Sequence, residues 1–139
     1  MRCLLDTNVF VHYTTDQDEL SADVMAILTD YDNQFYLSAE SVKEMVVAYR
    51  KKGFNSKRWK TARQMVEEIE DFGVNILPIR REHLLTLSSL VINEAQEHND
   101  PSDHIIISQA ITEHLTLVSA DKKFPFYQSQ GLELVMNKR

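Results

Sequence analysis

The sequence predicts an α/β domain in which short strands alternate with helices and pack into a mainly parallel sheet. Short apolar runs alternate with segments whose apolar residues recur at helical spacing. Residues that typically begin or end helices separate these segments. The 139 residues are 43% hydrophobic and include only three Gly and three Pro, as expected for a compact fold. We therefore expect a single layered domain over residues 1–139.

The first half of the chain predicts two strand–helix pairs. Residues 2–5 form an apolar run that we expect to be the first strand. Residues 20–30 carry apolar side chains on one face of a helix, and residues 34–37 are a second short strand. Ser38 is a favourable N-cap for the next helix, which should end near Gly53.

The second half continues the alternation. Apolar side chains recur at helical spacing over residues 59–69, and Gly73 is a suitable C-terminal cap before a strand at residues 74–77. Another helix is expected over residues 81–98. Asp100 and Pro101 then have the types typical of an N-cap and of the first helical position. The last two strands are expected at residues 115–118 and 132–136.

Four acidic residues follow strands or begin helices in this scheme. Asp6 directly follows the first strand and Asp121 closes the turn after the fourth. Asp103 is in the first turn of its helix, and Glu44 is two turns into another. In open parallel sheets, functional groups gather at the carboxyl ends of the strands. Four converging carboxylates would raise one another's pKa values unless divalent cations neutralised them. Their hard oxygen atoms suit Mg²⁺ or Mn²⁺, which support phosphodiester hydrolysis.

Each acid also has a structural explanation. Asp6 and Asp100 are good N-caps, and Asp103 is favourable at the positive end of a helix. Asp121 is a typical turn residue. Glu44 lies opposite the apolar stripe of its helix, where a solvated glutamate is expected.

The charge is unevenly distributed. The formal net charge is −6, yet residues 50–63 contain seven of the 15 basic residues and no acidic ones, which leaves −13 for the rest. Such a segment could bind a phosphate backbone and stack bases on its aromatic residues, or it could bind an acidic partner. The candidate RNA-binding residues are Lys51, Lys52, Lys57, Arg58, Trp59, Lys60 and His104. For Trp59 we favour packing in the core or in a dimer over base stacking.

Other features favour a cytoplasmic protein without a membrane segment. Cys3 is the one cysteine, so no intrachain disulfide can form, and we expect it to be a core residue of a cytoplasmic chain. No run approaches the roughly 18 uncharged residues that span a bilayer. The five histidines lack zinc-binding spacing, and we expect them at the surface, with His104 a candidate substrate contact.

Four motifs together resemble the PIN-domain family, most closely the VapC-like ribonuclease toxins. They are L-L-D-T-N at residues 4–8, L-S-x5-E-M at 37–45, D-P-S-D-H-I-I-I-S-Q-A at 100–110 and L-V-S-A-D-K-K-F at 117–124. The resemblance implies a Rossmann-like three-layer α/β/α sandwich. It also implies a Mg²⁺- or Mn²⁺-dependent endoribonuclease acting on single-stranded or loop RNA, a homodimer, and an antitoxin partner.

The resemblance assigns roles to individual residues. It implies that Asp6, Glu44, Asp103 and Asp121 hold the metal and the attacking water. Residues that would support them by hydrogen bonds are Thr7, Asn8 and Asp100. The chain departs from the common D-P-F-D-R pattern at Ser102 and His104, which puts the substrate in doubt.

Two other functions remain open from the sequence. A haloacid-dehalogenase-type phosphatase also begins with an aspartate after its first strand, but it needs a second acid where this chain has Asn8. A degenerate PIN module would bind RNA or a protein partner without cleavage.

Overall fold

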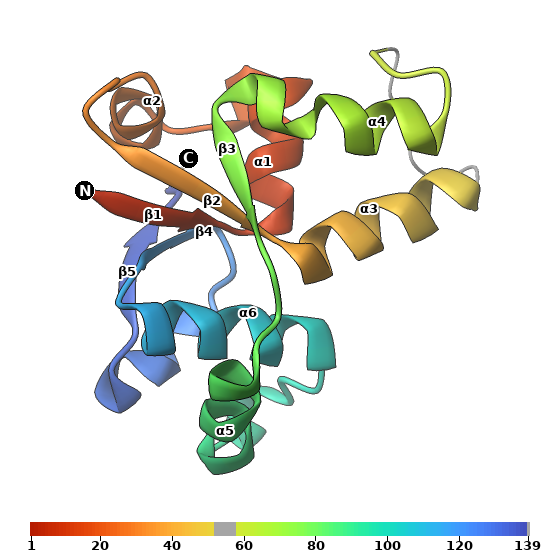
Figure 1. Cartoon of the computed structure of the whole chain (residues 1–139). Coiled ribbons are helices and arrows are strands. Elements are labelled where there is room, and N and C mark those ends of the chain that lie inside the picture. Colours follow the sequence, from red (N-terminus) through yellow and green to blue (C-terminus); the bar gives the residue numbers. More distant parts are fainter. Residues whose placement is uncertain (52–57, 139) are drawn as a thin grey trace.

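The fold is an α/β/α sandwich built on an all-parallel sheet (Figure 1). The computed structural model describes residues 1–51 and 58–138. The sheet has the order β3-β2-β1-β4-β5, so the first strand lies at its centre. The strands are β1 (Arg2–Leu5), β2 (Gln34–Ser38), β3 (Val74–Leu77), β4 (Thr116–Ser119) and β5 (Glu133–Met136). All five predicted strands are present within one residue of their expected bounds.

Helices cover both faces of the sheet. In Figure 1, α1 to α4 lie on one side of it, and α5 and α6 lie on the other. The α-helices are α1 (Thr7–Thr14), α2 (Ala22–Leu28), α3 (Ala39–Arg50), α4 (Ala62–Glu68), α5 (Arg81–Ser89) and α6 (Pro101–Glu113). Short 3-10 helices are η1 (Gln17–Glu19), η2 (Ile69–Phe72), η3 (Glu94–Gln96) and η4 (Phe124–Gln130).

Side-chain alternation along β1 divides the core between the two faces. Cys3 and Leu5 pack into the apolar cluster under α1 to α4, whereas Leu4 packs into the cluster with α6 and η4. Successive strand residues point to opposite faces, so a central strand must be apolar on both. This accounts for the uninterrupted apolar run at residues 3–5 and confirms the expected core position of Cys3.

Local end signals place several elements as expected. Asp100 accepts a hydrogen bond from the backbone N–H of Ser102, and Pro101 begins α6. Gly73 ends η2 with φ of 81°, a left-handed conformation that favours glycine. The helix expected to end near Gly53 has its last residue at Arg50, and Gly53 itself lies outside the described residues.

The predicted helix over residues 81–98 is wrong in its second half. The helix α5 ends at Ser89, and the chain then continues through an extended Leu90 to η3. The Gln130 side chain donates to the Val91 carbonyl and accepts from the Val91 N–H, both at 2.9 Å. Hydrogen bonds to a distant segment therefore replace the helical ones here. This break changes where the chain enters α6.

Candidate metal centre

Five carboxyl groups line one pocket at the carboxyl ends of the central strands. The pocket has a volume of about 380 Å³. Its lining consists of Asp6, Thr7, Asn8, Glu44, Asp100, Asp103, Ala120 and Asp121. All four acids predicted as metal ligands therefore lie together, along with the three residues predicted to support them. Asp6 and Asp121 come from adjacent parallel strands, as β1 and β4 pair directly.

Asp6 is the most enclosed of these acids. It follows β1 and is the N-cap of α1, where one carboxyl oxygen accepts from the Thr7 N–H at 2.9 Å. The other oxygen accepts from the Ser119 hydroxyl at 2.7 Å. Ser119 Oγ also accepts from the Asp121 N–H at 3.0 Å, so one serine connects the ends of both strands. The capping role predicted as an alternative is thus compatible with a place in the pocket.

Glu44 faces the pocket rather than open solvent. Its side chain accepts a hydrogen bond from the Thr7 hydroxyl at 2.9 Å, and Ser41 Oγ lies 2.8 Å from the same Thr7 oxygen. The alternative explanation of Glu44 as a solvated residue is therefore wrong, because Ser41 and Glu44 of α3 contact Thr7 of α1. Thr7 has the predicted role of holding a carboxylate.

A second polar cluster, formed by Glu40, Lys43 and Ser102, lies where the first turns of α3 and α6 meet. Ser102, where an aromatic residue is common in the motif, donates to the buried Glu40 carboxylate at 2.9 Å. Glu40 also forms an ion pair with Lys43. Although burial favours the neutral form, these contacts lower the pKa of Glu40 below its usual value. The small serine thus allows a hydrogen-bonded connection between the two helix starts.

Asp103 lies at the centre of the acidic group. Its pKa is raised from 3.8 to about 8. Burial is the largest cause, and the negative charges of the neighbouring carboxylates add to it: Asp6, Asp100, Asp121 and Glu44. Burial also raises the pKa values of Asp6 and Glu44, despite the hydrogen bonds that favour their charged forms. The surroundings therefore disfavour the ionised forms of these three acids.

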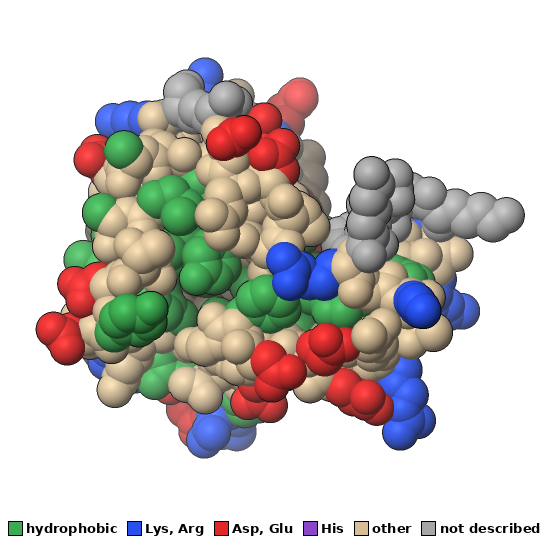
Figure 2. Space-filling view, turned by 90° about the horizontal axis from the view of Figure 1, so that it is seen from above, with side chains coloured by type: hydrophobic (Ala, Val, Ile, Leu, Met, Phe, Trp, Pro, Cys, Tyr) green, Lys and Arg blue, Asp and Glu red, His purple; other side chains and the backbone are tan. Residues whose placement is uncertain are grey.

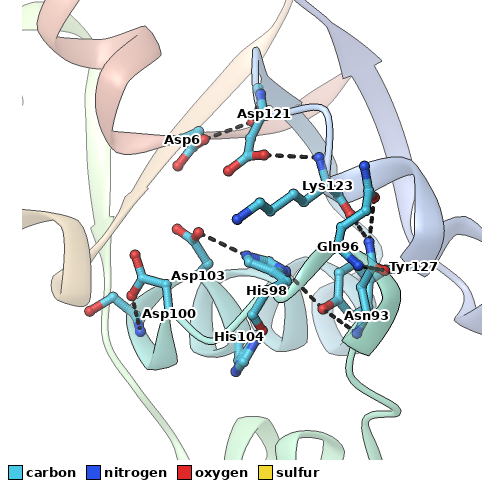
Figure 3. A network of polar contacts seen from close by, with 12 residues as sticks. Asp6, Asn93, Gln96, His98, Asp100, Asp103, His104, Asp121, Lys123 and Tyr127 are labelled. Carbon is cyan, nitrogen blue, oxygen red and sulfur yellow. Dashed lines mark hydrogen bonds and ion pairs between the residues drawn. The ribbon is translucent and has the colours of Figure 1, made fainter.

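Asp103 is also bound by a histidine that the sequence did not indicate. His98 Nε2 lies 2.9 Å from Asp103 Oδ2, and His98 Nδ1 lies 2.8 Å from the Tyr127 hydroxyl (Figure 3). Tyr127 in turn accepts from the Asn93 N–H at 3.1 Å. The break after α5 and the start of η4 bring these residues together. His98 precedes the D-P-x-D motif by two residues, which is its only sequence signal.

The expectation that all five histidines lie at the surface is wrong for three of them. His83, His98 and His104 are buried. His104 Nε2 lies 2.8 Å from the His98 carbonyl oxygen, which it binds as a donor. Its ring points away from the acids (Figure 3), so the prediction of His104 as an RNA contact is not supported.

The basic segment contains residues of different kinds. Trp59 is 2% exposed and packs edge-on against Phe72, so base stacking by Trp59 is wrong and core packing is confirmed. Arg58 donates to the Thr14 carbonyl and lies 5.0 Å from the Phe72 ring centre. Lys51 and Lys60 are exposed.

Two of the predicted RNA-binding residues, Lys52 and Lys57, lie outside the described part of the chain. In the view from above, Lys and Arg side chains mingle with acidic ones toward the side where α3 and α4 lie (Figure 2). The described surface there is of mixed charge.

The residues of the pocket fit a divalent cation. Carboxylate oxygens are the ligands that Mg²⁺ and Mn²⁺ prefer, and a bound cation would favour the ionised forms that burial disfavours. One oxygen of Asp103, one of Asp121 and one nitrogen of His98 lie within 4.8 Å of one another. Such a spacing allows one ion to contact all three residues.

The fold and the pocket define a class of α/β domains with acidic centres at the carboxyl ends of a parallel sheet. A family model described as PIN domain matches residues 3–128. The chain belongs to the PIN-domain family, as the sequence motifs predicted. A comparison with curated protein sequences found no match.

Solved structures share the fold across the whole chain. The VapBC2 complex of Rickettsia felis bound to a promoter DNA fragment matches with a TM-score of 0.73 and 18% identity, covering 99% of this chain and 100% of the other. VapBC-1 from nontypeable Haemophilus influenzae matches with a TM-score of 0.70 and 16% identity, covering all of both chains. FitAcB from Neisseria gonorrhoeae matches with a TM-score of 0.65 and 22% identity over 95% of each chain.

Within the described residues, no helix is long and apolar enough to cross a membrane.

Proposed function

We propose that this chain is a divalent-metal-dependent endoribonuclease that hydrolyses single-stranded or loop RNA, and that it is the toxin of a type II toxin–antitoxin pair. The observation that carries the proposal is the gathering of Asp6, Glu44, Asp100 and Asp121 around the half-buried Asp103 in one pocket. A purely structural role would not require five carboxyl groups to share a pocket, because their mutual repulsion costs stability.

Asp6, Glu44, Asp103 and Asp121 would hold Mg²⁺ or Mn²⁺. When bound, the ion lowers the pKa of a water molecule and neutralises charge on the phosphodiester. The surrounding hydroxyls orient the acids. Ser119 holds Asp6 and Thr7 holds Glu44, so two carboxylates from different elements keep fixed directions before any ligand arrives.

RNA is the proposed substrate because the family resemblance implies it and because exposed cations lie beyond the end of α3. Lys51 and Lys60 are exposed and could contact phosphates, whereas Arg63 is paired with Glu67 at 2.7 Å. The acidic pocket itself repels a polyanion, so substrate binding depends on cations around it and within it.

The toxin assignment and the antitoxin partner are supported by the likeness to solved structures described as toxin–antitoxin complexes. A homodimer is supported by large hydrophobic side chains exposed on and after α5. Leu84, Leu85 and Val91 are 49%, 52% and 62% exposed. The single buried cysteine fits a reducing cytoplasm.

The test is cleavage of a mixed pool of structured and single-stranded RNA with Mg²⁺, with Mn²⁺ or with EDTA. Asp6→Asn should abolish cleavage, because it removes a ligand charge while keeping the side-chain shape. Asp32→Asn is the matched control, since Asp32 is exposed on the turn before β2. It should cleave like the unmodified chain.

Cleavage that needs the metal and disappears in Asp6→Asn alone would support the nuclease. RNA binding without cleavage under all metal conditions would instead favour a PIN module that binds RNA or a protein partner. Cleavage that persists in EDTA would contradict the metal-dependent mechanism.

A further inference from the structure

His98 borders the acidic pocket through one edge of its ring, where Nε2 contacts the pocket-lining Asp103. The residue is 1% exposed, and its ring packs against His104, Phe124 and Tyr127 with centroid separations of 4.9, 5.5 and 5.5 Å. Its backbone N–H donates to the Asn93 carbonyl, and its carbonyl oxygen accepts from His104. Both the backbone and the ring are therefore held, and Nε2 is the ring nitrogen directed toward the acids (Figure 3).

We infer that His98 Nε2 is a ligand of the divalent cation, beside the carboxylates of Asp103 and Asp121, so that this centre has a nitrogen as well as oxygens in its ligand set. The inference rests on the proposed function, because it concerns the cation of the same pocket. It adds a residue that neither the acidic motifs nor the family resemblance assigned.

The spacing of the atoms fits this role. Nε2 of His98 and Oδ2 of Asp103 are 2.9 Å apart. Adjacent ligands of an octahedral ion with bonds of about 2.0 to 2.1 Å are separated by about 2.9 Å. One oxygen each of Asp103 and Asp121 and one ring nitrogen of His98 all lie within 4.8 Å of one another. His98 and Asp103 are thus spaced like adjacent ligands of one ion, and Asp121 lies near enough to join them when its side chain turns toward that ion.

The second nitrogen of the ring has the partner expected of a metal-binding histidine. Such histidines usually donate the other ring N–H to a fixed acceptor, which sets the tautomer and the ring direction. Here Nδ1 lies 2.8 Å from the hydroxyl oxygen of Tyr127, which is itself buried and also accepts from the Asn93 N–H. With Nδ1 as the donor, Nε2 carries a lone pair that faces Asp103.

The chemical consequence is a change in metal preference. Imidazole nitrogen binds Mn²⁺ and later transition metals more readily than Mg²⁺, which favours oxygen. A centre with one histidine should therefore discriminate in favour of Mn²⁺ more strongly than a centre made of carboxylates alone.

The test uses Mn²⁺ itself. Two samples of the unmodified chain are prepared, one with ¹⁵N-labelled histidine and one without label. Both are loaded with Mn²⁺ and measured by electron spin-echo spectroscopy. We expect a ¹⁴N coupling that is replaced by a ¹⁵N coupling in the labelled sample. This readout needs no variant and no cleavage activity.

Titrations with Mn²⁺ and Mg²⁺ test the same inference by affinity. His98→Gln should weaken Mn²⁺ binding by about 10- to 100-fold and Mg²⁺ binding by less. Tyr127→Phe removes only the hydroxyl that holds Nδ1, and it should weaken Mn²⁺ binding in the same direction by a smaller factor. His12→Gln, in the last turn of α1, is the control and should leave both affinities unchanged.

The outcomes separate the inference from the proposed function. If Mn²⁺ binds and supports RNA cleavage but shows no histidine nitrogen coupling, the inference is overturned and the nuclease stands. Equal losses of Mn²⁺ and Mg²⁺ affinity in His98→Gln would also overturn it, because His98 would then only position Asp103. If the unmodified chain binds no divalent ion at all, both proposals fail.

Discussion

Replacing Asp103 with asparagine should stabilise the metal-free protein, and more so as the pH rises. Asparagine has nearly the same shape as the protonated carboxyl group and can keep a hydrogen bond to His98. It removes the group whose charge the pocket tolerates least, because the Asp103 side chain is only 17% exposed and lies among the other carboxyl groups.

The magnitude follows from the pKa of Asp103, which burial and the neighbouring charges raise from 3.8 to about 8. Below pH 3.8 the carboxyl is neutral in both the folded and the unfolded chain. As the pH rises from there to about 8, only the unfolded chain releases the proton, so the stability of the unmodified protein falls. The cost is about 1.4 kcal/mol per pH unit, with a limit of about 5 kcal/mol at pH 7.5 and about 1.6 kcal/mol at pH 5.

The pocket opens to solvent, so we expect about half of these limits. Asp103→Asn should then raise the free energy of unfolding by about 2.5 kcal/mol at pH 7.5 and about 1 kcal/mol at pH 5. The assay is urea unfolding in EDTA at both pH values, followed by circular dichroism. The exposed Asp32→Asn should change the free energy by less than about 0.5 kcal/mol at either pH.

Saturating Mn²⁺ should reverse the order at pH 7.5, because the ion binds the unmodified folded chain more tightly than the variant. The reasoning is refuted if Asp103→Asn is less stable than the unmodified chain in EDTA at pH 7.5. It is also refuted if the difference between the two proteins does not grow with pH. Either result would mean that the favourable position of Asp103 in the first turn of α6 outweighs the repulsion.

Three further substitutions test other parts of the site. Ser119→Ala removes the donor to Asp6 and should lower the free energy of unfolding by about 1 to 3 kcal/mol in urea titrations at neutral pH; an unchanged stability would mean that water replaces the hydroxyl. The Lys123 side chain extends toward the acids (Figure 3), so Lys123→Met should strengthen Mn²⁺ binding several-fold by calorimetry, and weaker binding would contradict a repulsive role. Lys60→Ala should weaken RNA binding and reduce the slope of log affinity against log salt by about 0.7, whereas Lys138→Ala should leave both unchanged; equal slopes in the two variants would exclude Lys60 from phosphate contact.

Much of the site could be predicted because its acids carry local signals. Asp6 directly follows β1, Asp121 comes two residues after β4, and Asp103 belongs to a helix start that Asp100 and Pro101 define. Parallel strands end on the same side of a sheet, so these residues had to meet once the strands paired.

Glu44 and His98 could not be placed in the same way. The direction of Glu44 depends on the packing of α3 against α1, since its own helix would equally allow a solvated position. The place of His98 depends on the break after α5. The sequence pattern favours a continued helix there, but Gln130 and Tyr127 bind the backbone of residues 91 and 93 from η4. Those contacts turn the chain so that His98 reaches Asp103.

The strand–helix alternation, the caps at Asp100 and Gly73 and the acids after the strands can all be read from residues close together in the chain, because each depends on backbone preferences within one or two turns. The shared pocket depends on pairs such as Asp6 and Ser119, which lie 113 residues apart and meet across neighbouring strands. Which groups become buried, and therefore which pKa values rise and which ring nitrogen faces an ion, follows only from how the layers pack. Desolvation is a property of all the surrounding atoms, and no local pattern of residues contains it.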